Sequence, residues 1–183
     1  MITISIKELE KRLERKIEID SLVFGIDTAS RTGWCQIKTD KENAYIDYGF
    51  VDIQSKDHYY KYDKMIEFFE SLIKKSFLGP PTGGKVVIED VFFGRNVNTL
   101  KMLARIGMIV YVVTKQIDVP KTFILASTAR AKLGFHGTAK KEFVHKQIAK
   151  RLKLKITDVD IVDALVLALT GLVSEKGLFN GKK

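Results

Sequence analysis

The run Leu22-Val23-Phe24-Gly25-Ile26-Asp27 is apolar up to its last residue, which is an acid. Such a run is typical of a buried strand. An ionised carboxylate at the end of a buried strand is costly unless a hydrogen bond or a cation compensates it. A second run, Lys85-Val86-Val87-Ile88-Glu89, ends in the same way. Because ligand sites of open α/β sheets lie beyond the carboxyl ends of the strands, the two runs predict that Asp27 and Glu89 converge on a ligand.

The alternation of side chains along a strand assigns each acid to a face. Asp27 shares its face with Gly25, where the missing side chain leaves room for a ligand or for a closely packed backbone. Glu89 lies on the opposite face of its strand to Val86 and Ile88.

Asp160 and Asp163 open a long apolar segment, residues 157–174, that predicts a helix. Their spacing of three places both acids on one helical face. Thr157 is a natural N-cap, and Asp160 near the first turn has the alternative interpretation of a residue that favours the helix dipole. Asp163 lies past the first turn among apolar residues, where a carboxylate without a cation would be expensive.

These acids indicate a hard, oxygen-binding cation such as Mg²⁺ or Mn²⁺ rather than zinc. Cys35 is the only cysteine, so the chain has neither an intramolecular disulfide nor a cysteine cluster for zinc. Two divalent ions about 4 Å apart can activate a water and stabilise the leaving oxygen in phosphodiester hydrolysis. The acidic set therefore predicts a metal site suited to a nuclease.

The charge of the chain favours a polyanionic partner, because the net charge is +9 and the pI is about 9.5. Much of the excess lies between Arg130 and Lys155, where Glu142 is the single acid. A solvated helix face is the alternative interpretation. Proximity to the acidic pair favours nucleic-acid contact by basic residues that include Arg130, Lys132, Lys140, Lys141 and Lys146.

The length of 183 residues predicts one main domain, at residues 21–175, after an N-terminal helical extension at 1–20 and before a tail at 176–183. The N-terminus lacks the pattern of a secretory signal, and no apolar segment is expected to be long enough to span a bilayer. We therefore expect an intracellular protein with no membrane partner. It would act in the cytoplasm or nucleoid, or in the DNA compartment of a host cell or organelle.

Periodicity and turn residues give the remaining elements. A helix is expected at 7–18, with further helices at 58–77, 98–116, 139–152 and 157–174, and strands at 22–28, 34–38, 44–53, 85–91 and 121–126. Gly33 suits a tight hairpin turn, and Asn96 or Asn98 would cap the helix at 98–116. Three antiparallel strands followed by alternating strands and helices predict an α/β fold with a mixed sheet.

Taken in order, these pieces resemble the RuvC-type Holliday junction resolvases of the ribonuclease H-like superfamily. The matching residues are 25–27, 32–34, 88–92, 96, 100–107, 137–141 and 160–165. The resemblance runs from about residue 22 to 172. It implies a ribonuclease H-like five-stranded mixed sheet flanked by helices, to which the N-terminal helix is an addition.

The resemblance also implies a function. A RuvC-type resolvase is a Mg²⁺-dependent endodeoxyribonuclease that cuts a four-way DNA junction by paired symmetric nicks. Two ions per subunit are implied, with Mn²⁺ able to substitute. By position, Asp27, Glu89, Asp160 and Asp163 would be the metal ligands, and Lys141 resembles the family's basic residue near the scissile phosphate.

Further residues acquire expected roles from the same resemblance. Phe92 resembles the aromatic side chain that inserts at the junction, Phe93 is an alternative, and either has the competing interpretation of a core residue. Arg95 beside them is expected to contact DNA, and Arg130 stands near the position of a second family lysine. The helix at 98–116 would supply the contact of a homodimer.

Two other functions remain open from the sequence. The acidic set is shared by other ribonuclease H-like nucleases that act on RNA:DNA hybrids, flap DNA or ribosomal RNA precursors. In a non-catalytic protein that binds branched DNA, the acids would serve only as helix caps, and the basic segment would do all the binding.

Overall fold

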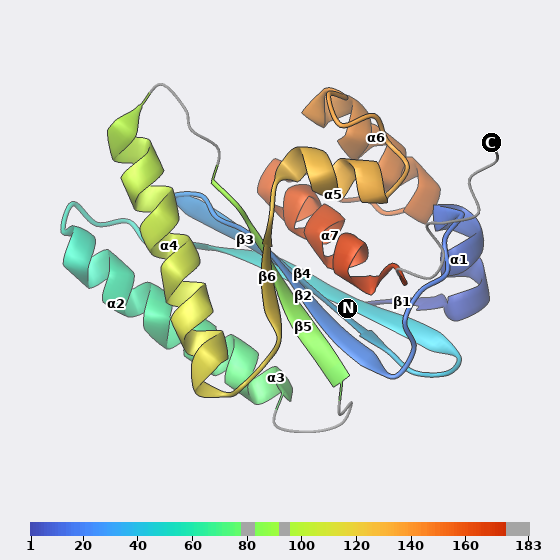
Figure 1. Cartoon of the computed structure of the whole chain (residues 1–183), viewed down its shortest axis with the longest axis horizontal. Helices are drawn as coiled ribbons and strands as arrows, with labels where there is room; N and C mark the ends of the chain where they lie inside the picture. Colours follow the sequence, from blue (N-terminus) through green and yellow to red (C-terminus); the bar gives the residue numbers. More distant parts are fainter. Residues whose placement is uncertain (78–82, 92–95, 175–183) are drawn as a thin grey trace.

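A mixed sheet in the strand order β1-β4-β3-β2-β5-β6 separates two layers of helices (Figure 1). The structure is a computed structural model and describes residues 1–77, 83–91 and 96–174. The strands are β1 (Ile2–Ser5), β2 (Ser21–Asp27), β3 (Arg31–Thr39), β4 (Asn43–Asp52), β5 (Gly83–Glu89) and β6 (Lys121–Ile124). The helices are α1 (Ile6–Leu13), α2 (His58–Phe69), α3 (Lys75–Phe77), α4 (Val97–Gln116), α5 (Ala126–Lys132), α6 (Lys141–Leu152) and α7 (Val159–Leu172).

The order of the strands follows from how the chain connects them. β2, β3 and β4 pair antiparallel through short turns, whereas β5 pairs parallel with β2, β6 pairs parallel with β5, and both are reached through helices. The predicted α/β fold with a mixed sheet flanked by helices is confirmed. The sheet has six strands rather than five, because β1 pairs antiparallel with β4, with Thr3 opposite Tyr45.

Each face of the sheet has its own hydrophobic core. Alternate residues of β2 divide between them: Val23 packs in the core that includes α7, and Phe24 in the core that includes α2 and α4. α7 lies across the centre of the first face, while α2 and α4 cover the second (Figure 1). Gly25 permits this packing, because a Cβ there would lie 2.1 Å from the carbonyl oxygen of Ala164 in α7. The space beside Asp27 is therefore filled by helix backbone.

The N-terminal segment is part of the same packing. Leu9 and Leu13 of α1 are buried in the α7-side core. Arg12 donates through Nη1 to the carbonyl oxygen of Leu152, the last residue of α6, at 2.7 Å. The predicted helix at 7–18 is shorter than expected, because Glu14 adopts a left-handed conformation and ends it.

Several local predictions need correction. Gly33 lies within β3 opposite Asp27 rather than in the turn, and a Cβ there would meet the backbone oxygen of Asp160 at 2.2 Å. The N-cap of α7 is Asp158 rather than Thr157, and its side chain accepts from the backbone N–H groups of residues 160 and 161. The helix expected at 58–77 forms, with a π-helical turn at Glu70–Lys74. α5 was not predicted; it begins where the strand at 121–126 was expected to end.

Candidate active site

Asp27 and Glu89 lie side by side at the carboxyl ends of two parallel strands. Ile26 of β2 is in register with Ile88 of β5, so the next residue of each strand is an acid. Alternation directs both carboxyl groups to the face of the sheet that α7 covers. The two side chains share a hydrogen bond.

The surroundings of Asp27 disfavour its charged form. The residue is 5% exposed. Burial, the hydrogen bond with Glu89 and the negative charges of Glu89 and Asp163 raise the pKa of Asp27 to about 10, although the ammonium group of Lys141 opposes the shift. The Asp27–Glu89 pair therefore keeps a proton between its two carboxyl groups at neutral pH. A divalent cation would relieve the same repulsion, so this oxygen-only pair fits Mg²⁺ or Mn²⁺.

Asp163 reaches this region from α7. The close approach of the helix at Gly25 involves Ala164, the neighbour of Asp163. Glu89 and Asp163 line one small cavity together with Arg130. Acids from a strand and from a helix that are 74 positions apart in the sequence thus face the same space.

Two side chains of α6 hold Asp163. The Nζ atom of Lys141 forms an ion pair with Oδ2, and Nε2 of His145 lies 2.7 Å from Oδ1. Burial acts to lower the pKa of Lys141. The hydrogen bond with Asp163 and the charges of Asp163, Asp27 and Glu89 outweigh it, so the pKa of Lys141 is raised overall. The ammonium group is therefore charged beside the three carboxyl groups.

Asp160 has a different partner. Its Oδ2 atom pairs with Nη1 of Arg31, at the start of β3. The same guanidinium group pairs with Asp158 and stacks over the ring of Phe50, 3.6 Å from the centroid. Asp160 is thus held at the first turn of α7 by an ion pair with Arg31, which Asp158 shares.

The four acids are not grouped closely enough to form a metal site. Within the described parts of the chain, no three His, Cys, Asp or Glu side chains are grouped so that they could hold a metal ion. Asp27 and Glu89 are in contact through their shared proton, whereas Lys141 and His145 hold Asp163. A shared ion therefore requires Oδ2 of Asp163 to exchange the ammonium group of Lys141 for the ion.

The expected DNA-contacting residues are placed unevenly. Arg130, on α5, donates through Nη1 to the carbonyl oxygen of Ala139 at 3.1 Å and lines the cavity of the acids. Lys132 is half-buried on α5, and Lys140 and Lys146 are exposed at α6. Phe92, Phe93 and Arg95 lie outside the described residues.

Sequence reasoning missed two residues at this site. A single histidine on a helix most simply predicts an ordinary polar residue, but the position of His145 four after Lys141 places both side chains on one face of α6. Arg31 carried no local signal, because its partners lie more than 120 positions later in the chain.

Comparisons with known proteins agree with this arrangement. A family model described as crossover junction endodeoxyribonuclease RuvC matches residues 23–171. No curated protein matches the sequence.

Solved structures share the fold. RuvC of Thermus thermophilus has a TM-score of 0.67 at 21% identity, covering 81% of this chain and 92% of its own. The T. thermophilus RuvC in complex with a Holliday junction substrate has a TM-score of 0.66 at 19% identity, covering 81% and 91%. The yeast mitochondrial Holliday junction resolvase Ydc2 has a TM-score of 0.56 at 12% identity, covering 88% and 82%. Since the family model spans most of the chain, the protein belongs to the RuvC family of crossover junction endodeoxyribonucleases.

Proposed function

We propose that the protein resolves four-way DNA junctions as a divalent-metal-dependent endonuclease that makes paired symmetric nicks. Membership of the family gives the class of reaction. The observation that carries the proposal is the Asp27–Glu89 contact at the carboxyl ends of β2 and β5, with Asp27 buried and with Glu89 and Asp163 lining one cavity. Carboxylates that meet in this way are costly unless they bind a cation.

Three acids are the proposed metal ligands. Asp27, Glu89 and Asp163 would hold Mg²⁺, or Mn²⁺ in its place, and we propose two ions per subunit. When bound, such ions activate a water and stabilise the leaving oxygen of a phosphodiester. Asp160 would join the set only after its side chain leaves Arg31.

Two basic side chains would act on the scissile phosphate. Lys141 is charged beside the acids, and Arg130 lines their cavity. A fixed positive charge next to the reacting phosphorus stabilises the negative charge that develops in the transition state. A cleft of about 460 Å³ adjoins Glu89 between α4, the end of β5 and the start of α5. This cleft gives a DNA strand a path to the acids.

The phosphate backbone of the arms would be held by the basic surface of α5 and α6. Lys140 and Lys146 are exposed there, close in sequence to Lys141. Contacts of this type position DNA without reading its sequence, and they weaken as salt is added. Branched DNA rather than a particular sequence is therefore the proposed ligand of this surface.

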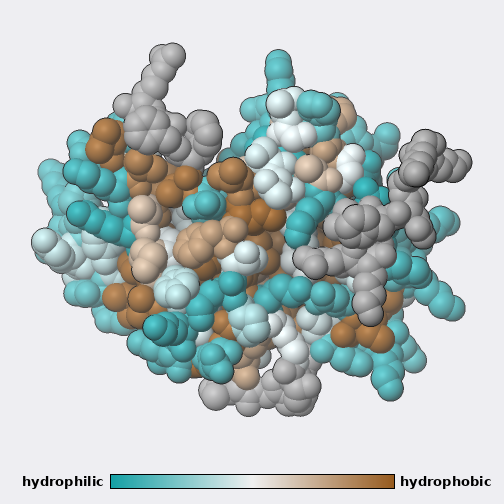
Figure 2. Space-filling view, in the orientation of Figure 1, coloured by the Kyte–Doolittle hydropathy of each residue, from teal (hydrophilic) through white to brown (hydrophobic). Residues whose placement is uncertain are grey.

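A homodimer is proposed through α4, whose outward face is apolar. From the sequence, the contact is expected from Met102, Ile106, Ile109 and Val113, because these apolar residues exceed what one face of the sheet needs. Met102 and Ile109 are partly buried against the core. In the structure Ile106 and Val113 are buried in the core, whereas Met108 and Val112 are about half exposed. Figure 2 shows hydrophobic residues over α4 and beside it, toward the centre of this face of the molecule.

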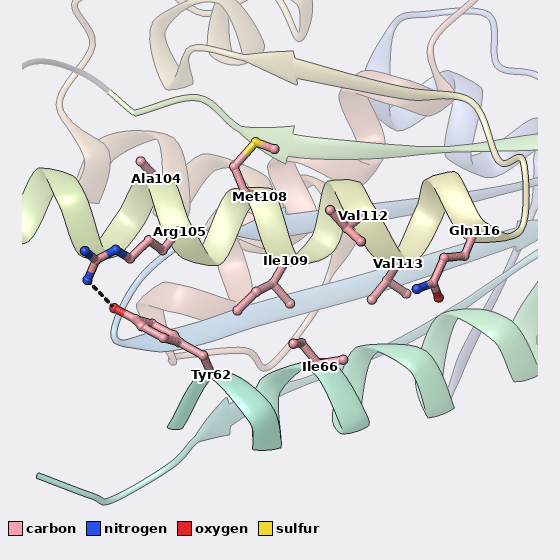
Figure 3. Close-up of a pocket in the computed structure, with 9 residues that line it drawn as sticks. All are labelled: Tyr62, Ile66, Ala104, Arg105, Met108, Ile109, Val112, Val113 and Gln116. Carbon is pink, nitrogen blue, oxygen red and sulfur yellow. Dashed lines mark hydrogen bonds between the residues drawn. The ribbon is translucent and has the colours of Figure 1, made fainter. Parts of the chain in front are cut away.

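A groove of about 500 Å³ runs between α2 and α4 (Figure 3). Ile66 of α2 and Ile109, Val112 and Val113 of α4 line its apolar part, and Arg105 donates to the hydroxyl of Tyr62 at one end.

The expectation that no segment is long and apolar enough to span a bilayer is wrong, because α4 is so by length and composition, and 28% of its apolar window is buried. A two-fold axis that passes beside α4 would bury this surface and present two acidic sites to the two-fold symmetry of a junction. Sedimentation of Val112→Asp beside the wild type tests this, with a shift from dimer to monomer expected.

Cleavage of a synthetic four-way junction tests the catalytic proposal. With Mg²⁺ the wild type should introduce two nicks at symmetric positions on opposite strands, and with EDTA none. Asp27→Asn and Asp163→Asn should lose cleavage by at least about a thousandfold while still shifting the junction in a gel, because metal ions supply most of the charge stabilisation in such reactions. Asp63→Asn, on the exposed face of α2, is the matched control and should cut normally.

Competing substrates separate the proposal from its alternatives. An RNA:DNA hybrid, a flap and a junction are compared under equal conditions. Preferential paired nicking of the junction supports the proposal. Preferential cutting of the hybrid or flap would assign the chain to another ribonuclease H-like activity, and binding without any metal-dependent cutting would reduce it to a branched-DNA-binding protein.

A further inference from the structure

We infer that His145 is a positioning residue for Asp163. Through a hydrogen bond to Oδ1 it fixes the carboxylate of Asp163, so that Oδ2, which pairs with Lys141, is the oxygen left for an ion shared with the Asp27–Glu89 pair. The inference rests on the proposed function, because it assigns Asp163 to the metal site. It extends that function to a residue of α6 that touches neither metal nor DNA.

The contact is short and sheltered. Nε2 of His145 lies 2.7 Å from Oδ1 of Asp163, and the two side chains are 12% and 16% exposed. An ionised carboxylate has only acceptor sites, so Nε2 must carry the hydrogen whether the ring is neutral or charged. In such a sheltered place a hydrogen bond is little weakened by competition from water.

The helix that carries His145 is anchored from several sides. Val144, Ile148 and Leu152, at successive turns of α6, are buried in the α7-side core. At its C-terminal end Arg12 donates to the carbonyl oxygen of Leu152. α6 therefore cannot follow a movement of Asp163 easily, and the imidazole is a fixed point relative to α7.

Lys141 holds the second oxygen of Asp163 in a different manner. Its side chain is 41% exposed and ends a flexible four-carbon stem. The ammonium group can leave Asp163 for a phosphate without moving the helix, whereas the ring of His145 has only two torsions. The two contacts therefore divide the roles: Lys141 is an exchangeable counter-ion, and His145 retains the carboxylate when Lys141 departs.

A partner that orients a metal-binding side chain affects metal affinity directly. Removing such partners typically costs about 10- to 100-fold in affinity or activity. Without His145, Asp163 could rotate about its own side-chain torsions. Binding of an ion shared with Asp27 and Glu89 would then have to fix the Asp163 side chain, and this cost would lower the affinity for the ion. The expected defect is thus in metal affinity, and it should be overcome by more metal.

The test compares His145→Ala and His145→Gln. Mn²⁺ binding is measured by calorimetry on the full chain without DNA, and junction cleavage is measured across a Mg²⁺ titration. We expect His145→Ala to bind Mn²⁺ about 10- to 100-fold more weakly and to need correspondingly more Mg²⁺ for half-maximal cleavage, with a maximal rate within about threefold of the wild type. His145→Gln, whose side-chain amide can donate to Asp163, should restore most of the affinity.

Controls separate this inference from simpler explanations. His58→Ala removes an exposed histidine from the start of α2, on the other side of the sheet from α6, and should leave Mn²⁺ binding unchanged. Thermal unfolding in EDTA checks that each variant is folded. Wild-type affinity in a folded His145→Ala protein overturns the inference, and so does a Gln variant as weak as the Ala variant. If the wild type itself neither binds Mn²⁺ nor cuts the junction, the proposed function fails and takes the role of His145 with it.

Discussion

Replacing Asp27 by Asn should make the metal-free protein more stable. The wild-type side chain keeps a proton in the folded protein that it loses in the unfolded chain. Burial and the contact with Glu89 raise the pKa of Asp27 from 3.8 to about 10. Between these values the folded protein binds one proton more than the unfolded chain, so the free energy of unfolding falls as the pH rises. Asn has a similar shape and no proton to lose.

The size of the effect follows from the pH interval. One proton changes the free energy of unfolding by about 1.4 kcal/mol per pH unit. Over the interval from the ordinary pKa of 3.8 up to pH 7 this gives about 4 kcal/mol as an upper bound. The opposing charge of Lys141 is already contained in the raised pKa, so we expect Asp27→Asn to exceed the wild type by up to about 4 kcal/mol at neutral pH.

Urea unfolding in EDTA measures this difference. Wild type and Asp27→Asn are compared from about pH 5 to about pH 8, with Asp63→Asn as the control. The advantage of Asp27→Asn should shrink toward acidic pH, since the unfolded wild type then regains the proton. Saturating Mg²⁺ should reduce the difference in the free energy of unfolding, because the ion stabilises only the wild type. At a Mg²⁺ concentration one hundred times the dissociation constant, this stabilisation is about 2.7 kcal/mol. A difference that does not vary with pH would refute the reasoning.

Three other variants probe the packing around the site. Gly25→Ala should lose at least about 3 kcal/mol in urea unfolding, because its Cβ would meet the backbone of α7 at 2.1 Å, whereas Gly83→Ala, with 3.8 Å to the nearest atom, should be nearly neutral. Lys141→Met should abolish junction cleavage yet bind Mn²⁺ at least as tightly as the wild type in calorimetry, since a competing cation of Asp163 is removed. Arg12→Ala should cost about 1–3 kcal/mol in urea unfolding by leaving the last carbonyl of α6 without its donor.

The sequence predicted those parts of the fold and site that local pattern determines. Apolar runs that end in an acid indicated β2 and β5, and their parallel pairing then had to bring Asp27 and Glu89 together. β1 could not be predicted, because a four-residue strand at the edge of the sheet exists only through its pairing with β4. His145 and Arg31 could not be assigned either, since each acquires its role from a partner on another element.

Asp160 and Asp163 illustrate the limit of spacing as evidence. They are the same residue type, three apart on one helix, yet each pairs with basic side chains from a different element. Asp160, at the first turn, meets Arg31 of β3, whereas Asp163, one turn later, meets Lys141 and His145 of α6. Arg31 is also fixed by Asp158 and Phe50, so it leaves Asp160 less readily than Lys141 leaves Asp163. The proposed metal site would therefore be built first on Asp27, Glu89 and Asp163, and any contribution of Asp160 would require the breaking of a second, more firmly held ion pair.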